Sequence, residues 1–83
     1  MSRKNLVKEI LYRSIHRGCK ETDHLIGGFA KEKIEQLSDI ELCVFKELIS
    51  EDDLSVYDWI LGKEKTPQKY FNMIKKMQQF HNL

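Results

Sequence analysis

Apolar residues recur along this chain at intervals of three and four, which is the period of an amphipathic α-helix. The first such stretch runs from Arg3 to His16. Its apolar stripe consists of Leu6, Val7, Ile10, Leu11, Ser14 and Ile15. A second stretch begins near Lys20 or Glu21 and ends near Leu37. Its face consists of Ile26, Phe29, Ala30, Lys33, Ile34 and Leu37. The pattern predicts helices and no strand.

Helix-start and helix-end signals mark three further helices. Ser38 and Glu41 have the spacing of a capping box that would open a third helix. Its predicted core face is Ile40, Val44 and Leu48, with Phe45 alongside. One aspartate of Glu51-Asp52-Asp53 would cap a fourth helix, which ends at Gly62. The fourth helix carries Leu54, Tyr57, Trp59, Ile60 and Leu61, and its aromatic residues are expected in the core.

A fifth helix is predicted after Thr66 and Pro67, with the threonine as N-cap and the proline as the first helical residue. Its stripe consists of Tyr70, Phe71, Ile74, Met77 and Phe80. Because the connections are short, neighbouring helices should pack against one another. The sequence therefore predicts an all-α protein, a compact five-helix bundle that forms a single domain over residues 1–83.

Two adjacent glycines, Gly27 and Gly28, interrupt the second helical pattern. Each costs a helix about 1 kcal/mol relative to alanine. The pair indicates either a kink or a close approach of another backbone at that point.

Composition and charge distribution narrow the classes of function. The chain has 83 residues and a net charge of +1. Residues 1–20 carry six basic and one acidic residue, residues 21–58 three basic and eleven acidic, and residues 59–83 five basic and one acidic. Such a pattern can steer a protein partner. Nucleic-acid binding would require basic charge to dominate the domain. The candidates for it are the basic residues of the first helix, Arg3, Lys4, Lys8, Arg13 and Arg17.

No apolar run approaches the ~20 residues that span a bilayer, and the first residues contain no apolar signal segment. We therefore expect a protein of the bacterial cytoplasm, or of the mitochondrial matrix if the source is a eukaryote.

Metal binding and catalysis have weak candidates. His16, Cys19, His24, Cys43 and His81 lack the paired short spacings of a zinc site. Surface histidines and reduced cysteines, with Cys43 in the core, are the favoured interpretation. No phosphate-binding glycine loop is present, because Gly27-Gly28 follows no strand. A domain this small offers little concave surface, so we predict no enzymatic activity and no catalytic, metal-binding or cofactor-binding residues.

The polar junction Arg17-Gly18-Cys19-Lys20-Glu21 lies between the first two helices. Helix-end chemistry accounts for it, since a cation suits the end of one helix and acids such as Glu21 and Asp23 suit the start of the next. An Arg and a Glu around a glycine also suit an exposed docking motif. The residues alone leave both interpretations open.

The order of motifs resembles the small five-helix family of succinate dehydrogenase flavinylation factors, over roughly residues 5–80. The shared features are Arg17-Gly18-x-x-Glu21 with Asp23, Gly28-Phe29-Ala30, Leu37-Ser38, Asp52-Asp53 and Tyr57-Asp58-Trp59-Ile60. Many members have a second arginine where this chain has His16, which makes one surface charge dependent on pH.

The resemblance implies an assembly factor that binds the flavoprotein subunit of succinate dehydrogenase, or of fumarate reductase, and promotes covalent attachment of FAD. It implies that His16, Arg17, Gly18, Glu21 and Asp23 form the partner-binding element. FAD would belong to the client, with no cofactor held stably by this chain, and a monomer with no nucleic-acid partner and no membrane insertion is expected. A generic helical interaction module, such as an adaptor or an antitoxin-like protein, is the alternative.

Overall fold

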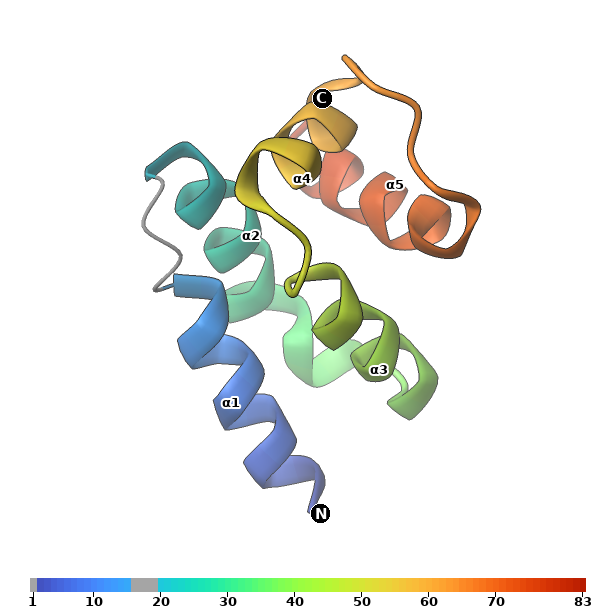
Figure 1. Cartoon of the computed structure of the whole chain (residues 1–83). Helices are drawn as coiled ribbons and strands as arrows, with labels where there is room; N and C mark the ends of the chain where they lie inside the picture. The colour runs from blue at the N-terminus through green and yellow to red at the C-terminus, as the bar shows by residue number, and fades with distance from the viewer. Residues whose placement is uncertain (1, 16–19) are drawn as a thin grey trace.

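The computed structural model describes residues 2–15 and 20–83, and within these ranges the chain forms five α-helices, two short 3₁₀ helices and no strand (Figure 1). The helices are α1 (Arg3–Ile15), α2 (Lys20–Lys33), α3 (Asp39–Leu48), α4 (Asp53–Leu61) and α5 (Phe71–Phe80). A 3₁₀ turn, Ile34–Gln36, continues α2, and a second, Gln68–Tyr70, precedes α5. The predicted all-α class and five helices are confirmed. No helix within the described ranges is long and apolar enough to cross a bilayer.

The core collects around α2, which contacts α1, α4 and α5. Ile26, Phe29 and Ala30 of α2 are buried, as the sequence pattern predicts. From α1, Val7 and Ile10 enter the same core, and the buried Ser14 hydroxyl donates a hydrogen bond of 2.7 Å to the Ile10 carbonyl. That bond satisfies the one polar group that α1 is seen to place in the core.

The glycine pair lies within α2, which runs unbroken from Lys20 to Lys33. The predicted approach of another backbone is not seen at Gly28, where a Cβ atom would lie at an ordinary contact distance, 3.7 Å, from Cε1 of His81. The approaching group is a side chain near the C-terminus. Nε2 of His81 lies 2.8 Å from the Leu25 carbonyl oxygen, which fixes the ring against α2.

The capping signals are confirmed for α3 and α4. The Ser38 hydroxyl accepts from the Glu41 backbone N–H at 3.1 Å, and Glu41 accepts from the Ser38 N–H at 2.9 Å. Asp52 is the N-cap of α4 and accepts from the Ser55 N–H at 3.1 Å. Gly62 ends α4 in the left-handed region at φ 77°. These bonds satisfy backbone donors that a helix start leaves without intrahelical partners.

The predicted core face of α3 is partly wrong. Leu42, Phe45 and Leu48 are buried, whereas Ile40 is 78% exposed. Cys43, which we predicted in the core, is exposed and a free thiol. At about 100° per residue, the helical phase set by Leu42 and Phe45 turns positions 40 and 43 toward solvent.

The predicted start of the fifth helix is also wrong. Pro67 has an extended ψ of 142° and precedes a 3₁₀ turn, so Thr66 is not an N-cap. The turn carries Tyr70 into the core, and its hydroxyl donates a 2.7 Å hydrogen bond to Glu51. Burial, with that hydrogen bond second, raises the pKa of Tyr70 to about 12. Phe71, predicted in the stripe, is 52% exposed because Met73, Ile74 and Met77 form the buried face.

The observed phase of α3 predicts that replacing two nearby apolar residues by alanine will lower the stability of the fold by very different amounts. Leu42→Ala should lower the free energy of unfolding by about 2–5 kcal/mol, because it leaves a cavity in the core. Ile40→Ala should change it by less than about 0.5 kcal/mol. Chemical denaturation followed by circular dichroism measures both, and equal losses would contradict the phase described.

The capping box predicts a pH dependence of stability. The Ser38 backbone N–H, with Lys76 nearby, holds the pKa of Glu41 below its ordinary 4.5. A carboxyl with a lowered folded-state pKa stabilises the fold above pH 4.5, and that stabilisation is lost as the pH falls through the folded-state pKa. Glu41→Gln keeps the hydrogen-bond acceptor without the charge. It should lower the free energy of unfolding by about 0.3–1 kcal/mol at neutral pH, and this difference should vanish in acid. Glu35→Gln, at an exposed position without an ion pair among the described residues, is the control.

Candidate protein-docking site

The first turn of α2 holds two of the five predicted docking residues. Glu21 is exposed and Asp23 is half-buried, both at the positive end of the helix dipole. His16, Arg17 and Gly18 lie outside the described residues. The same is true of Cys19. The structure therefore positions the acidic half of the predicted motif.

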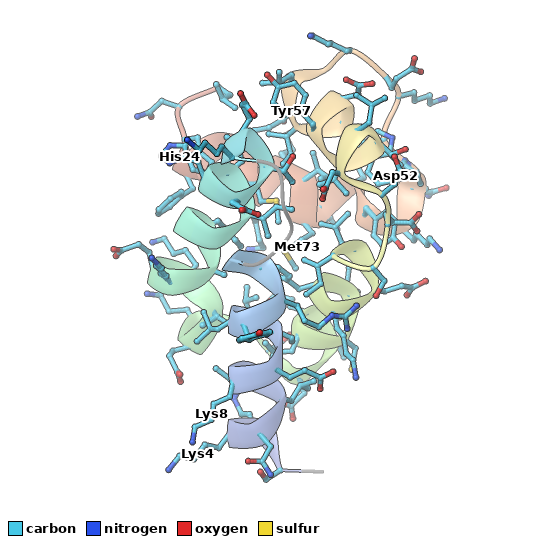
Figure 2. All side chains as sticks on the ribbon, turned by 60° about the vertical axis from the view of Figure 1, so that its left-hand side comes forward. Lys4, Lys8, His24, Asp52, Tyr57 and Met73 are labelled. Carbon is cyan, nitrogen blue, oxygen red and sulfur yellow. The ribbon has the colours of Figure 1, made fainter. Side chains whose placement is uncertain are left out.

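The start of α4 faces the start of α2 across a hollow of about 420 Å³. Glu21, Thr22, Asp53, Leu54 and Tyr57 line it, and we call it the acidic hollow. Two helix N-termini thus meet at one site, each with an acidic residue in its first turn. Figure 2 shows Tyr57, Asp52 and His24 at this end of the molecule, with Lys4 and Lys8 at the other.

Apolar surface is exposed beside these carboxylates. Leu54 is 68% exposed, and Tyr57 is half-buried with Nζ of Lys63 5.6 Å from its ring centroid. Val56 and Ile60 fix the phase of α4, which places Leu54 on the opposite side of the helix. The sequence pattern did not identify Leu54, Thr22 and Asp53 as residues of a candidate docking site. The phase of Val56 and Ile60 was the signal that could have revealed Leu54.

Thr22 adds a buried polar atom at the same place. Its side chain is fully buried, and its hydroxyl has no hydrogen-bond partner among the described residues. A buried hydroxyl without a partner costs about 1–3 kcal/mol. Such a cost within a candidate site is consistent with selection for something other than stability.

The remaining candidates for chemistry are not brought together. The rings of His24 and His81 lie 5.8 Å apart, but Cys43 is on α3. Within residues 2–15 and 20–83, no group of three or more His, Cys, Asp or Glu could hold a metal ion. The candidate nucleic-acid face of α1 is partly neutralised, because Arg3 pairs with Asp39 and Arg13 lies 3.8 Å from Glu9.

A known protein family and known relatives match most of this sequence, including the junction between the first two helices. A family model described as "Flavinator of succinate dehydrogenase" matches residues 8–81, which include α2, α3, α4 and α5. The chain belongs to this family. The resemblance inferred from the motifs is therefore confirmed.

Three relatives illustrate the range of the family. The succinate dehydrogenase assembly factor 2, mitochondrial, of Dictyostelium discoideum is 34% identical over 76 residues, covering 92% of this chain and 54% of the relative. The protein of the same name from Saccharomyces cerevisiae strain S288c is 34% identical, covering 86% of this chain and 47% of the relative. The FAD assembly factor SdhE of Acetobacter pasteurianus is 31% identical over 71 residues, covering 84% and 65%. The chain spans about half the length of the first two. No solved structure is significantly similar to it.

The buried hydroxyls of Thr22 and Ser14 should make opposite contributions to the stability of the fold. Thr22→Val keeps the shape and removes the unpartnered oxygen, so the free energy of unfolding should rise by about 1 kcal/mol. Ser14→Ala, which removes the hydroxyl bonded to Ile10, should lower it by about 0.5–1.5 kcal/mol. Thermal and urea denaturation compare the two variants. A clear loss of stability in Thr22→Val would mean that the hydroxyl is paired in solution.

Proposed function

We propose that this protein is a non-catalytic assembly factor that binds the flavoprotein subunit of succinate dehydrogenase and promotes covalent attachment of FAD to it. Fumarate reductase would be a second client of the same kind. The family match over residues 8–81 carries the proposal, because it includes the Arg-Gly-x-x-Glu junction and four whole helices. The names of the relatives support it, since they are assembly factors of succinate dehydrogenase or of FAD.

The proposed docking element comprises His16, Arg17, Gly18, Glu21 and Asp23. Glu21, exposed at the start of α2, would make charge-assisted hydrogen bonds to the client. Gly18 would allow close approach of the client backbone, and Arg17 would pair with a client carboxylate.

The acidic hollow would extend this element onto α4. An arginine or lysine of the client fits its chemistry: the aliphatic stem would lie on Leu54 and Tyr57, and the cationic head would meet Glu21 and Asp53. The cation already near the Tyr57 ring supports this mode, because that ring is accessible to a positive charge.

The assembly factor would act on the conformation of the client. The flavin supplies the bond-forming chemistry toward a histidine of the client. The factor contributes no nucleophile. It would bind more tightly to the client conformation in which that histidine meets the flavin, and this difference in affinity shifts the population.

Flavinylation in a reconstituted mixture tests the proposal. The factor, the flavoprotein subunit and FAD are mixed, and covalent flavin is read as fluorescence on a denaturing gel. The native protein should increase the signal over the subunit alone. Glu21→Gln should reduce this increase about tenfold, because one buried charge-assisted contact is worth roughly that factor, and Gly18→Trp should abolish it while the helical circular dichroism spectrum is kept.

Glu32→Gln is the matched control, since Glu32 is exposed on the same helix outside the docking element. Full flavinylation with Gly18→Trp would refute the docking role of the junction. No increase with the native protein would refute the assembly function itself.

A further inference from the structure

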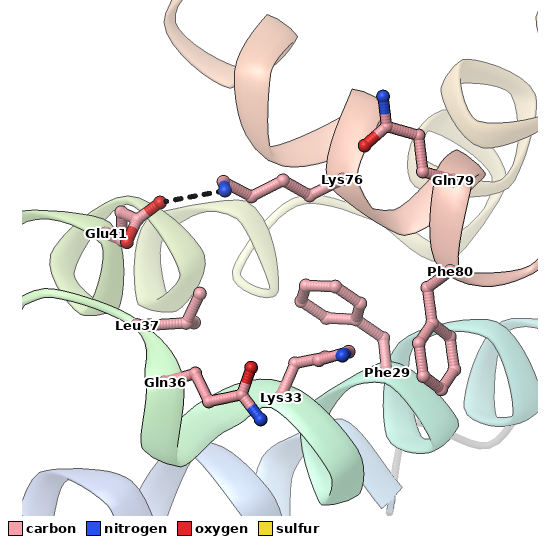
Figure 3. Close-up of a pocket in the computed structure, with 8 residues that line it drawn as sticks. All are labelled: Phe29, Lys33, Gln36, Leu37, Glu41, Lys76, Gln79 and Phe80. Carbon is pink, nitrogen blue, oxygen red and sulfur yellow. Dashed lines mark ion pairs between the residues drawn. The ribbon is translucent and has the colours of Figure 1, made fainter.

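A groove along α5 has no role in the function proposed above. It consists of two adjoining cavities of about 510 and 480 Å³, which share Glu41, Lys76 and Gln79. Figure 3 shows the first cavity, with the Lys76–Glu41 ion pair joining α5 to α3. The groove lies toward the C-terminal end of α2 and includes Lys33. Lys33 is about 18 Å along the helix axis from Glu21, which lines the acidic hollow.

Four lysines line this groove: Lys33, Lys69, Lys75 and Lys76. We call it the lysine groove. Two of these lysines are paired, Lys69 with Glu47 at 2.9 Å and Lys76 with Glu41 at 3.5 Å. Lys33 and Lys75 make no ion pair among the described residues and lie instead over aromatic rings, 6.0 Å from Phe80 and 5.3 Å from Phe71. The groove therefore carries a surplus of positive charge.

Among the described residues, Glu41 is the one acidic side chain that lines the groove, and it is already engaged. Glu41 accepts a hydrogen bond from the Ser38 backbone N–H as part of the capping box of α3. A carboxylate that serves both the helix start and Lys76 cannot also neutralise Lys33 and Lys75, so the surplus remains available to a ligand.

Apolar side chains are exposed or half-buried between the lysines. Ile40 lines the second cavity and is 78% exposed, and Val44 beside it is half-buried. Phe80 is half-buried at the first cavity. A row of apolar positions flanked by cations is the surface that an amphipathic acidic segment covers, with its apolar side down and its carboxylates at the rim.

We propose that the lysine groove is a second docking site, which binds an acidic amphipathic segment of a protein partner. Charge complementarity selects this occupant, because the groove offers two cations without carboxylate partners among the described residues beside an apolar strip. Concave shape favours a peptide segment over a flat lipid surface. The lysine groove shares no lining residue with the acidic hollow, so the two can be occupied independently.

Titration with a synthetic peptide tests the proposal. The probe is a peptide with leucines at helical i, i+3, i+4 and i+7 positions and glutamates elsewhere, added to isotope-labelled protein and followed by NMR. The expected shifts lie at Lys33, Ile40, Lys75 and Lys76, with no change at Glu21 or Tyr57. The double variant Lys33→Glu/Lys75→Glu should weaken binding by at least about tenfold. Ile40→Ser should weaken it by about threefold, since it removes exposed apolar contact area.

Lys4→Glu/Lys8→Glu is the matched control. It makes the same change in net charge at exposed positions of α1, and it should alter affinity by less than about twofold. Circular dichroism verifies that each variant is folded. Equal weakening by both double variants, equal binding of a scrambled peptide, or shifts centred on the acidic hollow would overturn the proposal. Neither flavoprotein nor FAD is present in this experiment, so its failure would be distinct from a failure of the assembly function.

Discussion

Burial of Phe29 is the interaction on which the arrangement of helices depends. Its side chain is 2% exposed, its ring stacks on that of Phe45 at 5.8 Å, and it meets the edge of Phe80 at 5.7 Å. One residue of α2 thereby contacts both α3 and α5. Aromatic pairs of this geometry contribute about 0.5–1.5 kcal/mol beyond the burial of area. With α2 held in this way, its two ends are fixed relative to the rest of the molecule.

The two ends of α2 lead to surfaces of opposite charge. The start of the helix contributes Glu21 to the acidic hollow, and the last turn contributes Lys33 to the lysine groove. The lysine groove joins Lys33, from the mostly acidic stretch of residues 21–58, to three lysines from the basic stretch of residues 59–83. If both proposed docking sites are used, one small protein would engage two chemically different segments at once.

Exposed apolar residues mark both surfaces. Leu54 is 68% exposed beside the acidic hollow, and Ile40 is 78% exposed at the lysine groove. Both lie in the first turn of a helix whose start is fixed by a side-chain cap, Asp52 for α4 and Ser38 for α3. The caps fix where each helix begins, and the buried residues that follow fix its phase. Together they leave these two side chains in solvent, where a partner can cover them.

Sequence by itself determined the number of helices and the ends that carry a local cap, namely the start of α3 and both ends of α4. Caps such as Ser38–Glu41 and the left-handed Gly62 are local, because each requires only residues within a few positions along the chain. The period of the apolar residues likewise determined the buried face of α2. The family, too, was evident from the order and spacing of short motifs, and the family match agrees.

Tertiary structure decided which of several apolar residues in each short helix are buried. In α3 the sequence pattern predicted a face through Ile40, whereas Leu42 and Phe45 are buried and the ring of Phe45 stacks on that of Phe29. At the start of α5 a partly buried hydrogen bond from Tyr70 to Glu51 accompanies a 3₁₀ turn, where local rules predicted Pro67 in the first turn of an α-helix. The acidic hollow and the lysine groove could not be predicted either, because each joins residues from different helices. Such sites exist only once long-range packing has fixed both the phase of each helix and its neighbours.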